Sequence, residues 1–232
     1  MRLDKFIAEN KGLTRSQANK ALRQSAVKIN GEIVKSGAVQ VTPKDEIAFE
    51  NQILTWLESG HYFMLNKPAG YVCSNDDSEY PTIYQLFDYP LSTKLHSAGR
   101  LDVDTTGLIL LTDDGQWSHR VTSPKHHCPK TYLVTLADPI ENNYRQAFTD
   151  GILLRGEKAP TKPAELEIID DYQVNLTISE GRYHQVKRMF AALGNKVIAL
   201  HRWKIGEVVL DEQLAEGEFR SLTQAEIDNL GQ

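Results

Sequence analysis

Residues 1–58 carry short amphipathic elements that differ from the rest of the chain. Three apolar residues recur at helical spacing near the N-terminus: Leu3, Phe6 and Ile7. Thr14 and Gln17 form a capping-box pattern, which predicts the start of a second helix. Alternating apolar residues flank Asn30-Gly31 and predict a hairpin with a two-residue turn. We therefore expect a small N-terminal domain that ends in a linker over residues 52–60.

Residues 59–232 read as a larger domain in which predicted strands outnumber helices. Apolar runs of strand length occur at 62–66, 108–111, 133–136, 152–154, 164–168 and 174–178. Helical patterns occur at 117–121 and 140–148, from about 184, and near 223–227. The hairpin-like spacing of the strands favours an antiparallel arrangement. The chain is predicted to be α+β, with a mixed, mainly antiparallel sheet flanked by helices in the larger domain.

The most unusual polar stretch is 99–112. Arg100, Asp102 and Asp104 lie in a glycine-bounded turn directly before the apolar run 108–111. A turn that leads into a buried strand can hold a carboxylate at the mouth of a cleft. In an extended segment the two carboxylates would point the same way. An Asp in such a turn commonly bonds its own backbone, so the local pattern leaves a structural role open.

Two patterns resemble metal sites only in part. The spacing from Asp102 to Asp113 matches a calcium loop, but its second half is the apolar run 108–111 and not the start of a helix. His126-His127-Cys128 contains zinc-ligand types, but adjacent residues do not usually ligate one ion and no second cluster completes the set. No Gly-x-Gly-x-x-Gly or Walker motif occurs. We expect neither a metal nor a cofactor.

Composition places the chain among ordinary globular proteins, with 41% hydrophobic and 25% charged residues. The two cysteines, Cys73 and Cys128, make no disulfide framework and indicate a reducing cytoplasm. No apolar run approaches the roughly 18 residues that span a bilayer, and the N-terminus lacks a signal-peptide core. We expect a cytoplasmic monomer without membrane contact.

Charge is distributed unevenly. The net charge is −5, yet residues 1–44 carry nine Lys/Arg against three Asp/Glu. Such asymmetry indicates a basic domain that meets a polyanion. Within the acidic remainder, Gly181–Gly206 holds six Lys/Arg and no Asp/Glu. A helix from about 184 would place Lys187 and Arg188 on its first turns, one toward a cleft and one toward solvent or phosphate.

Two long motifs, Gly99–Thr112 and Glu180–Phe190, resemble the RsuA/RluA-type pseudouridine synthases. The short motif Asn66-Lys67-Pro68-x-Gly70 resembles the start of the catalytic domain in that family. The N-terminal pattern resembles an S4 RNA-binding domain, which is αL-like. The resemblance covers essentially the whole chain and is closest to the small-subunit branch of the family. It implies an S4-like domain over 1–58, a catalytic domain over 59–232 and an rRNA pseudouridine synthase that uses no cofactor.

The resemblance also implies roles for individual residues. Asp102 would be the essential carboxylate, acting as nucleophile or supporting an oxocarbenium-like or glycal species. Tyr132 would pack against the target base. Lys187 would pair with Asp102 and keep it ionised despite burial. Because relatives often carry Arg at this position, Arg188 remains a second candidate for the pairing.

Other cations are expected to contact RNA: Arg15, Lys20, Arg23, Lys67, Arg100, Lys130, Arg182, Arg188 and Arg202. The first three belong to the exposed face of the second helix. Asp104 is interpreted as structural, holding Arg100.

The implied substrate is one uridine of 16S rRNA, at position 516 in the usual 16S numbering, in free rRNA or an assembling small subunit. One alternative is a large-subunit rRNA site. Another is a non-catalytic ribosome-associated S4 protein, which the intact Arg100-Leu101-Asp102 opposes because a binder has no need of that carboxylate. A sugar glycosidase fits poorly, since a second catalytic carboxylate has no clear candidate besides Asp104.

Overall fold

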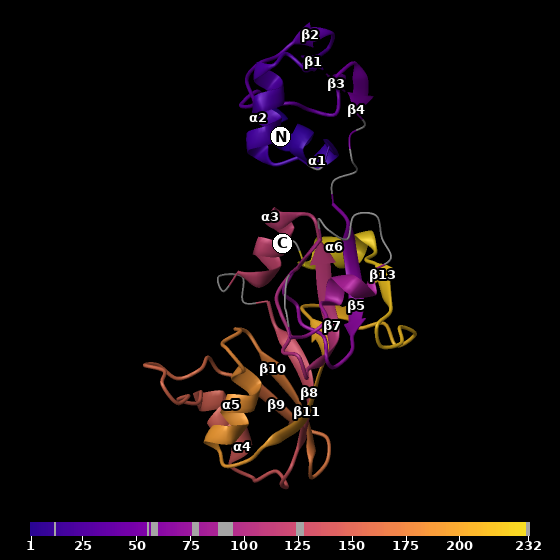
Figure 1. Ribbon diagram of the computed structural model, residues 1–232. Coiled ribbons are helices and arrows are strands. Elements are labelled where there is room, and N and C mark those ends of the chain that lie inside the picture. Colours follow the sequence, from indigo (N-terminus) through magenta and orange to yellow (C-terminus); the bar gives the residue numbers. More distant parts are fainter. Residues whose placement is uncertain are drawn as a thin grey trace. The chain divides into compact units, whose positions relative to one another are not determined.

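The chain divides into two compact units, Met1–Ser59 and Gly60–Gln232. The computed structural model (Figure 1) describes residues 1–11, 13–54, 56, 60–75, 79–87, 95–123 and 128–230. The boundary expected from the sequence, after residue 58, lies one residue before the one between the two units. Among the described residues, no helix is both long and apolar enough to cross a lipid bilayer.

The first unit packs two helices, α1 (Leu3–Lys11) and α2 (Arg15–Arg23), around one apolar core with a four-stranded sheet. Its strands, in the order β2-β1-β3-β4, are Glu32–Ile33, Val27–Ile29, Ile47–Phe49 and Gln52–Leu54. The capping box of Thr14 is confirmed, as is the hairpin, whose turn residues Asn30 and Gly31 both have positive φ. The predicted linker begins too early, because β4 pairs with β3 inside this unit.

The second unit is built on a nine-stranded sheet with the main order β13-β5-β7-β11-β8-β10-β9. The strands are β5 (Tyr62–Lys67), β6 (His96–Ser97), β7 (Thr106–Thr112), β8 (Lys130–Leu136), β9 (Glu165–Ile168), β10 (Gln173–Ile178), β11 (Val197–Ile205), β12 (Val208–Val209) and β13 (Phe219–Ser221). Only the β7–β11 pair is parallel among the described strands, so the predicted mainly antiparallel mixed sheet is confirmed.

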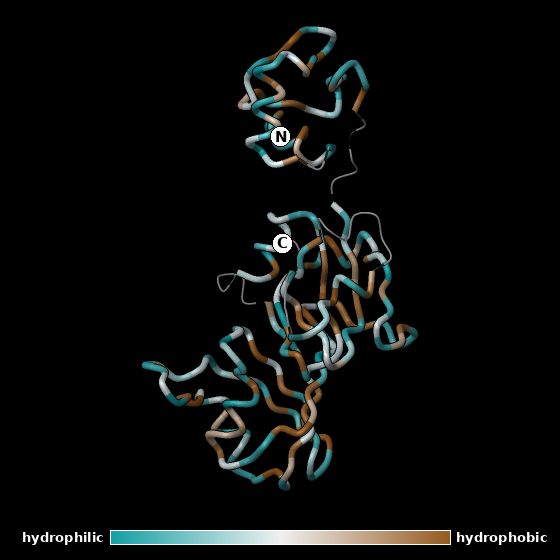
Figure 2. Tube along the Cα trace, in the orientation of Figure 1, coloured by the Kyte–Doolittle hydropathy of each residue, from teal (hydrophilic) through white to brown (hydrophobic). Residues whose placement is uncertain are grey.

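Helices cover the sheet in two groups (Figure 1). Near β8–β11 lie α4 (Tyr144–Asp150) and α5 (Gln185–Ala192), whose aromatic rings meet between Phe148 and Phe190. Near β5 and β7 lie α3 (Gly115–Thr122) and α6 (Gln224–Leu230), joined by the bond from Trp117 Nε1 to the carbonyl of Ile227. A 3₁₀ turn, η1, spans Ile83–Leu86. Figure 2 shows the hydrophobic runs following the strands of this unit.

Two predictions for the second unit are wrong in detail, and one strand was not predicted. The helix predicted from residue 140 begins at Tyr144, because the amide of Ile140 instead bonds the carbonyl of Asp171. Residues 152–154 form no strand, although Ile152 and Leu154 are buried. The strand β11 was not predicted, because its residues belong to the segment 181–206, which the sequence marks only as basic.

Gly107 allows β7 and β11 to approach closely. Its φ is +99°, and a Cβ added there would overlap the carbonyl oxygen of Arg202 on β11. Glycine is the residue that tolerates both the positive φ and the contact. This approach brings the start of β7, and the polar turn before it, directly beside β11.

We predict that Gly107→Ala destabilises the second unit by about 3 kcal/mol or more, because strain and overlap add. Gly115→Ala is the matched control: Gly115 lies in the first turn of α3, has an ordinary φ and open space at its Cβ. It should change stability by less than about 1 kcal/mol. Urea unfolding followed by tryptophan fluorescence measures both, and equal stability of the two variants would contradict the account.

Candidate active site

A tight turn over residues 102–105 presents the central carboxylate. The amide of Thr105 donates to the carbonyl of Asp102 at 3.1 Å. The segment is therefore a closed turn and not the extended strand in which alternate side chains would point the same way. From the other side, the amide of Gly70 donates to the carbonyl of Val103 at 2.8 Å, which ties the turn to the end of β5.

Lys67, the last residue of β5, fixes this turn through hydrogen bonds from its side chain. Its buried Nζ donates to the carbonyls of Pro68 (3.0 Å), Val103 (3.3 Å) and Thr105 (2.7 Å). Burial lowers the pKa of Lys67, partly offset by nearby negative groups that include Asp102. The predicted RNA contact is wrong, because the amino group is enclosed and already donates three hydrogen bonds.

Lys187 joins the two carboxylates of the turn. Its Nζ lies 3.4 Å from Asp102 Oδ2 and 2.5 Å from Asp104 Oδ1. Burial acts to raise the pKa of Asp104, but the hydrogen bond and charge of Lys187 leave that pKa below its usual value. Asp104 therefore partners Lys187 and not Arg100, which corrects the sequence interpretation.

His184 is the neighbour of Asp102 that the sequence analysis missed. Its Nε2 lies 3.5 Å from Asp102 Oδ1, and its backbone is left-handed with φ +47°. Such a φ is uncommon outside glycine and marks a constrained position. His184 lies just before α5, outside the helix, so helical spacing from Lys187 gave no signal for its place beside Asp102.

Tyr132 on β8 and Arg202 on β11 form the inner wall. The buried Arg202 donates from Nε to the carbonyl of Leu108 at 2.8 Å and from Nη1 to Tyr132 Oη at 3.4 Å. Its guanidinium lies 5.9 Å from the Tyr132 ring centroid. Arg202 was predicted to contact RNA from a basic stretch, but its buried bonds instead position the tyrosine. Its Nη2 has no hydrogen-bond partner among the described residues.

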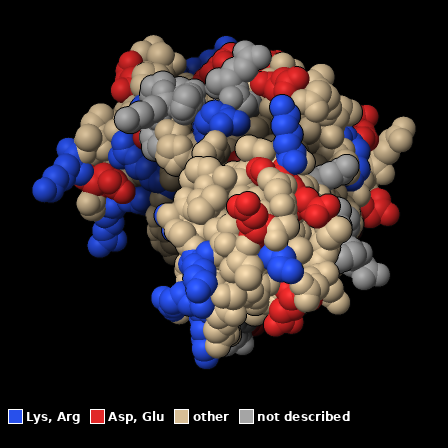
Figure 3. Space-filling view, turned by 90° about the horizontal axis from the view of Figure 1, so that it is seen from above, with Lys and Arg blue, Asp and Glu red and all other residues tan. Residues whose placement is uncertain are grey.

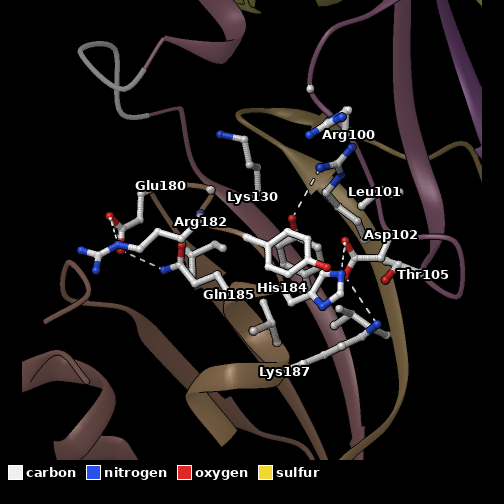
Figure 4. A pocket seen from close by; sticks show the side chains of 18 of the residues that line it. Arg100, Leu101, Asp102, Thr105, Lys130, Glu180, Arg182, His184, Gln185 and Lys187 are labelled. Carbon is white, nitrogen blue, oxygen red and sulfur yellow. Dashed lines mark hydrogen bonds and ion pairs between the residues drawn. The ribbon is translucent and has the colours of Figure 1, made fainter. Parts of the chain in front are cut away.

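One pocket of about 400 Å³ is lined by Asp102, Tyr132, His184, Lys187 and Arg202, among other residues. Figure 4 shows Asp102, His184 and Lys187 side by side, with Arg100 and Lys130 elsewhere on the wall. Lys130 donates to the carbonyl of Cys128 at 2.7 Å, and burial lowers its pKa. The volume falls in the range of sites for small molecules. An ion-paired carboxylate, an aromatic ring and cationic walls suit a nucleotide.

Arg182 and Arg188 stabilise the loop 151–163 through hydrogen bonds to its main chain. Both guanidiniums donate to main-chain carbonyls of residues 155–160, at 2.6 to 2.9 Å. Arg188 also bonds Glu157 at 3.2 Å, and Arg182 bonds Glu180 at 3.3 Å. Their predicted role in RNA contact is not supported by this geometry. Of the two candidates for the pairing with Asp102, the structure brings Lys187 to the carboxylate.

The remaining predicted cations lie in the first unit. Arg15, Lys20 and Arg23 are exposed on α2, as expected. Figure 3 shows Lys and Arg side chains at several places on the surface and Asp and Glu side chains at others. His126 and His127, considered as zinc ligands, lie outside the described residues. Among those described, no group of three His, Cys, Asp or Glu could hold a metal.

Comparisons with known proteins agree with the division of the chain into two units. A family model described as RNA pseudouridylate synthase matches residues 61–192, and a model of the S4 domain matches residues 1–47. The first covers the segment that contributes Asp102, Tyr132 and Lys187 to the pocket. The second covers both helices of the first unit and the strands β1 and β2.

Relatives of known name match the chain along its whole length. A protein of Haemophilus influenzae named ribosomal small subunit pseudouridine synthase A is 80% identical, over 99% of both chains. Its counterpart of the same name in Escherichia coli is 56% identical over 98% of both. A crystal structure described as a pseudouridylate synthase is 79% identical, covers 99% of each chain and superposes with a TM-score of 0.74.

We predict that Lys67→Met destabilises the second unit by about 2 kcal/mol or more, because three buried carbonyls lose their donor. Amide hydrogen exchange should speed up most in residues 102–105. Lys196→Met is the matched control, since Lys196 is exposed and lies in the same unit. It should stay within about 0.5 kcal/mol of the original protein. A Lys67→Met protein with unchanged stability and exchange would show that the turn does not depend on this amino group.

Proposed function

Because the chain belongs to the RNA pseudouridylate synthase family, we propose that it converts one uridine of 16S rRNA to pseudouridine, with Asp102 as nucleophile. The observation that carries this assignment is the position of Asp102, ion-paired with Lys187 in the pocket that Tyr132 lines. The choice of 16S rRNA is supported by relatives named for the small subunit, which match along their full length.

The reaction is an isomerisation. The N1–C1′ bond of the uridine breaks, the base rotates, and C5 bonds to C1′; C5 then loses its proton and N1 takes one up. Atoms and electrons balance within the nucleotide, so the chemistry requires no cofactor. Asp102 can attack as a nucleophile or support an oxocarbenium-like or glycal species, and both routes require an ionised carboxylate.

The surrounding residues fit such a reaction. Lys187 stabilises the negative charge of Asp102, and His184 adds a second donor when its ring presents a proton. The ring of Tyr132, oriented by Arg202, packs on the uracil after it has left the RNA stack. Arg100 and Lys130 on the wall contact the phosphates on either side of the flipped nucleotide.

The first unit acts as the RNA anchor. Residues 1–58 bind rRNA through Arg15, Lys20 and Arg23, while residues 59–232 carry out the reaction. Contacts of this kind position the protein on the phosphate backbone without reading sequence. The target is position 516 in the usual 16S numbering, in rRNA or an assembling small subunit, and the protein works as a monomer in the cytoplasm.

We predict that a strain lacking this protein loses one carbodiimide-dependent reverse-transcription stop, at position 516 of 16S rRNA. The original gene should restore the stop, whereas Asp102→Asn should not, because a neutral amide is a poor nucleophile and carries no negative charge to stabilise an oxocarbenium-like species. Asp102→Asn should still fold and bind rRNA with an affinity within about threefold of the original, since it keeps the shape of the side chain.

Three other outcomes would contradict the assignment. Restoration of the stop by Asp102→Asn would remove Asp102 from the reaction. A stop missing from large-subunit rRNA instead would change the substrate. No missing stop in either RNA would favour a non-catalytic S4 protein.

A further inference from the structure

Tyr183 is an exposed aromatic side chain at the rim of the pocket. Its exposed fraction is 75%, higher than that of any other exposed large hydrophobic residue among those described. The ring is stacked on the imidazole of His184, with centroids 3.8 Å apart and planes 18° from parallel. Burial in a core does not explain this residue, because most of its surface meets solvent.

The ring stands on a rigid support. The amide of Gln185 donates to the carbonyl of Arg182 at 3.1 Å, and the amide of Arg182 donates to Gln185 Oε1 at 2.8 Å. Arg188 Nη1 donates to the carbonyl of Tyr183 at 3.1 Å. A planar side chain with two torsions on such a support loses little conformational entropy when a ligand stacks on it.

The stacked pair also adjoins the reacting carboxylate. His184 lies beneath the ring of Tyr183 and places its Nε2 3.5 Å from Asp102 Oδ1. Tyr183 and His184 line the same pocket as the cations Arg100 and Lys130. A polyanion drawn to these cations therefore passes an exposed aromatic face. Such a combination of cations and aromatic rings is typical of surfaces that bind single-stranded nucleic acid.

We propose that Tyr183, supported by His184, stacks with the base of the nucleotide next to the target uridine. When a base leaves its stack, its neighbours each lose a stacking partner, which is part of the energy needed for flipping. The ring of Tyr183 replaces that partner and so stabilises the flipped RNA. The inference rests on the proposed function, because it needs an RNA with one nucleotide in the pocket.

The test is the rate of tritium release from small-subunit particles assembled with 16S rRNA labelled at C5 of uridine. Tyr183→Leu, which removes the aromatic face, should raise KM about tenfold and change kcat less than threefold. Tyr183→Phe keeps that face and should return KM to within about threefold of the original. The control Tyr172→Leu removes another tyrosine, 46% exposed in a turn outside the pocket, and should change neither constant.

A second measurement identifies the stacked base. In rRNA ligated from fragments, an abasic nucleotide on one side of the target should abolish the KM difference between the original protein and Tyr183→Leu. An abasic nucleotide on the other side should leave the difference intact. A merely structural role of Tyr183 would not depend on the neighbouring base.

Several results would overturn the proposal. An unchanged KM in Tyr183→Leu, or a KM difference that survives both abasic substitutions, excludes stacking while tritium release continues. A loss confined to kcat would instead assign Tyr183 to the support of His184 beside Asp102. If the original protein releases no tritium from these particles, the proposed function fails and the stacking proposal fails with it.

Discussion

The buried ammonium group of Lys67 is the constraint on which the candidate site depends. It donates to three carbonyls around the 102–105 turn and so fixes the direction in which Asp102 leaves the backbone. Gly107 then lets the following strand lie against β11. Together Lys67 and Gly107 hold a short polar turn in one geometry beside a large sheet, which is the fixed position that the proposed role of Asp102 needs.

Once the turn is fixed, distant parts of the chain complete the site. Asp102 comes from the turn before β7, Tyr132 from β8, Arg202 from β11 and Lys187 from α5. The buried cations Lys67 and Arg202 bond main-chain carbonyls inside the unit. Lys187, which is less buried, pairs with the carboxylates of Asp102 and Asp104. Arg182 and Arg188 tie the loop 151–163 to the segment just before α5, which carries Tyr183 and His184. Lys67, Arg182, Arg188 and Arg202 thus use their positive charge to hold the fold around the pocket.

The sequence predicted correctly those elements whose structure depends on neighbouring residues in the chain. The capping box of Thr14, the turn at Asn30-Gly31 and the apolar run before Thr112 each specify their own structure. The roles of Lys67 and Arg202 could not be predicted in this way, because their burial depends on strands that are distant in the sequence. The strand pattern of β11 was concealed by its polar residues His201, Arg202 and Lys204, of which Arg202 lines the pocket. His184 was missed because its backbone conformation is set by the turn that Arg182 and Gln185 close.

The central claim is that Asp102, and not its neighbour Asp104, is the reacting carboxylate. The most direct test compares single-turnover pseudouridine formation by Asp102→Asn and Asp104→Asn on small-subunit particles. Both substitutions remove one carboxylate charge near Lys187, so they differ mainly in the position of the lost group. We predict a loss of at least about 10⁴-fold for Asp102→Asn and of less than about 100-fold for Asp104→Asn. Equal losses, or the larger loss at Asp104, would contradict the account.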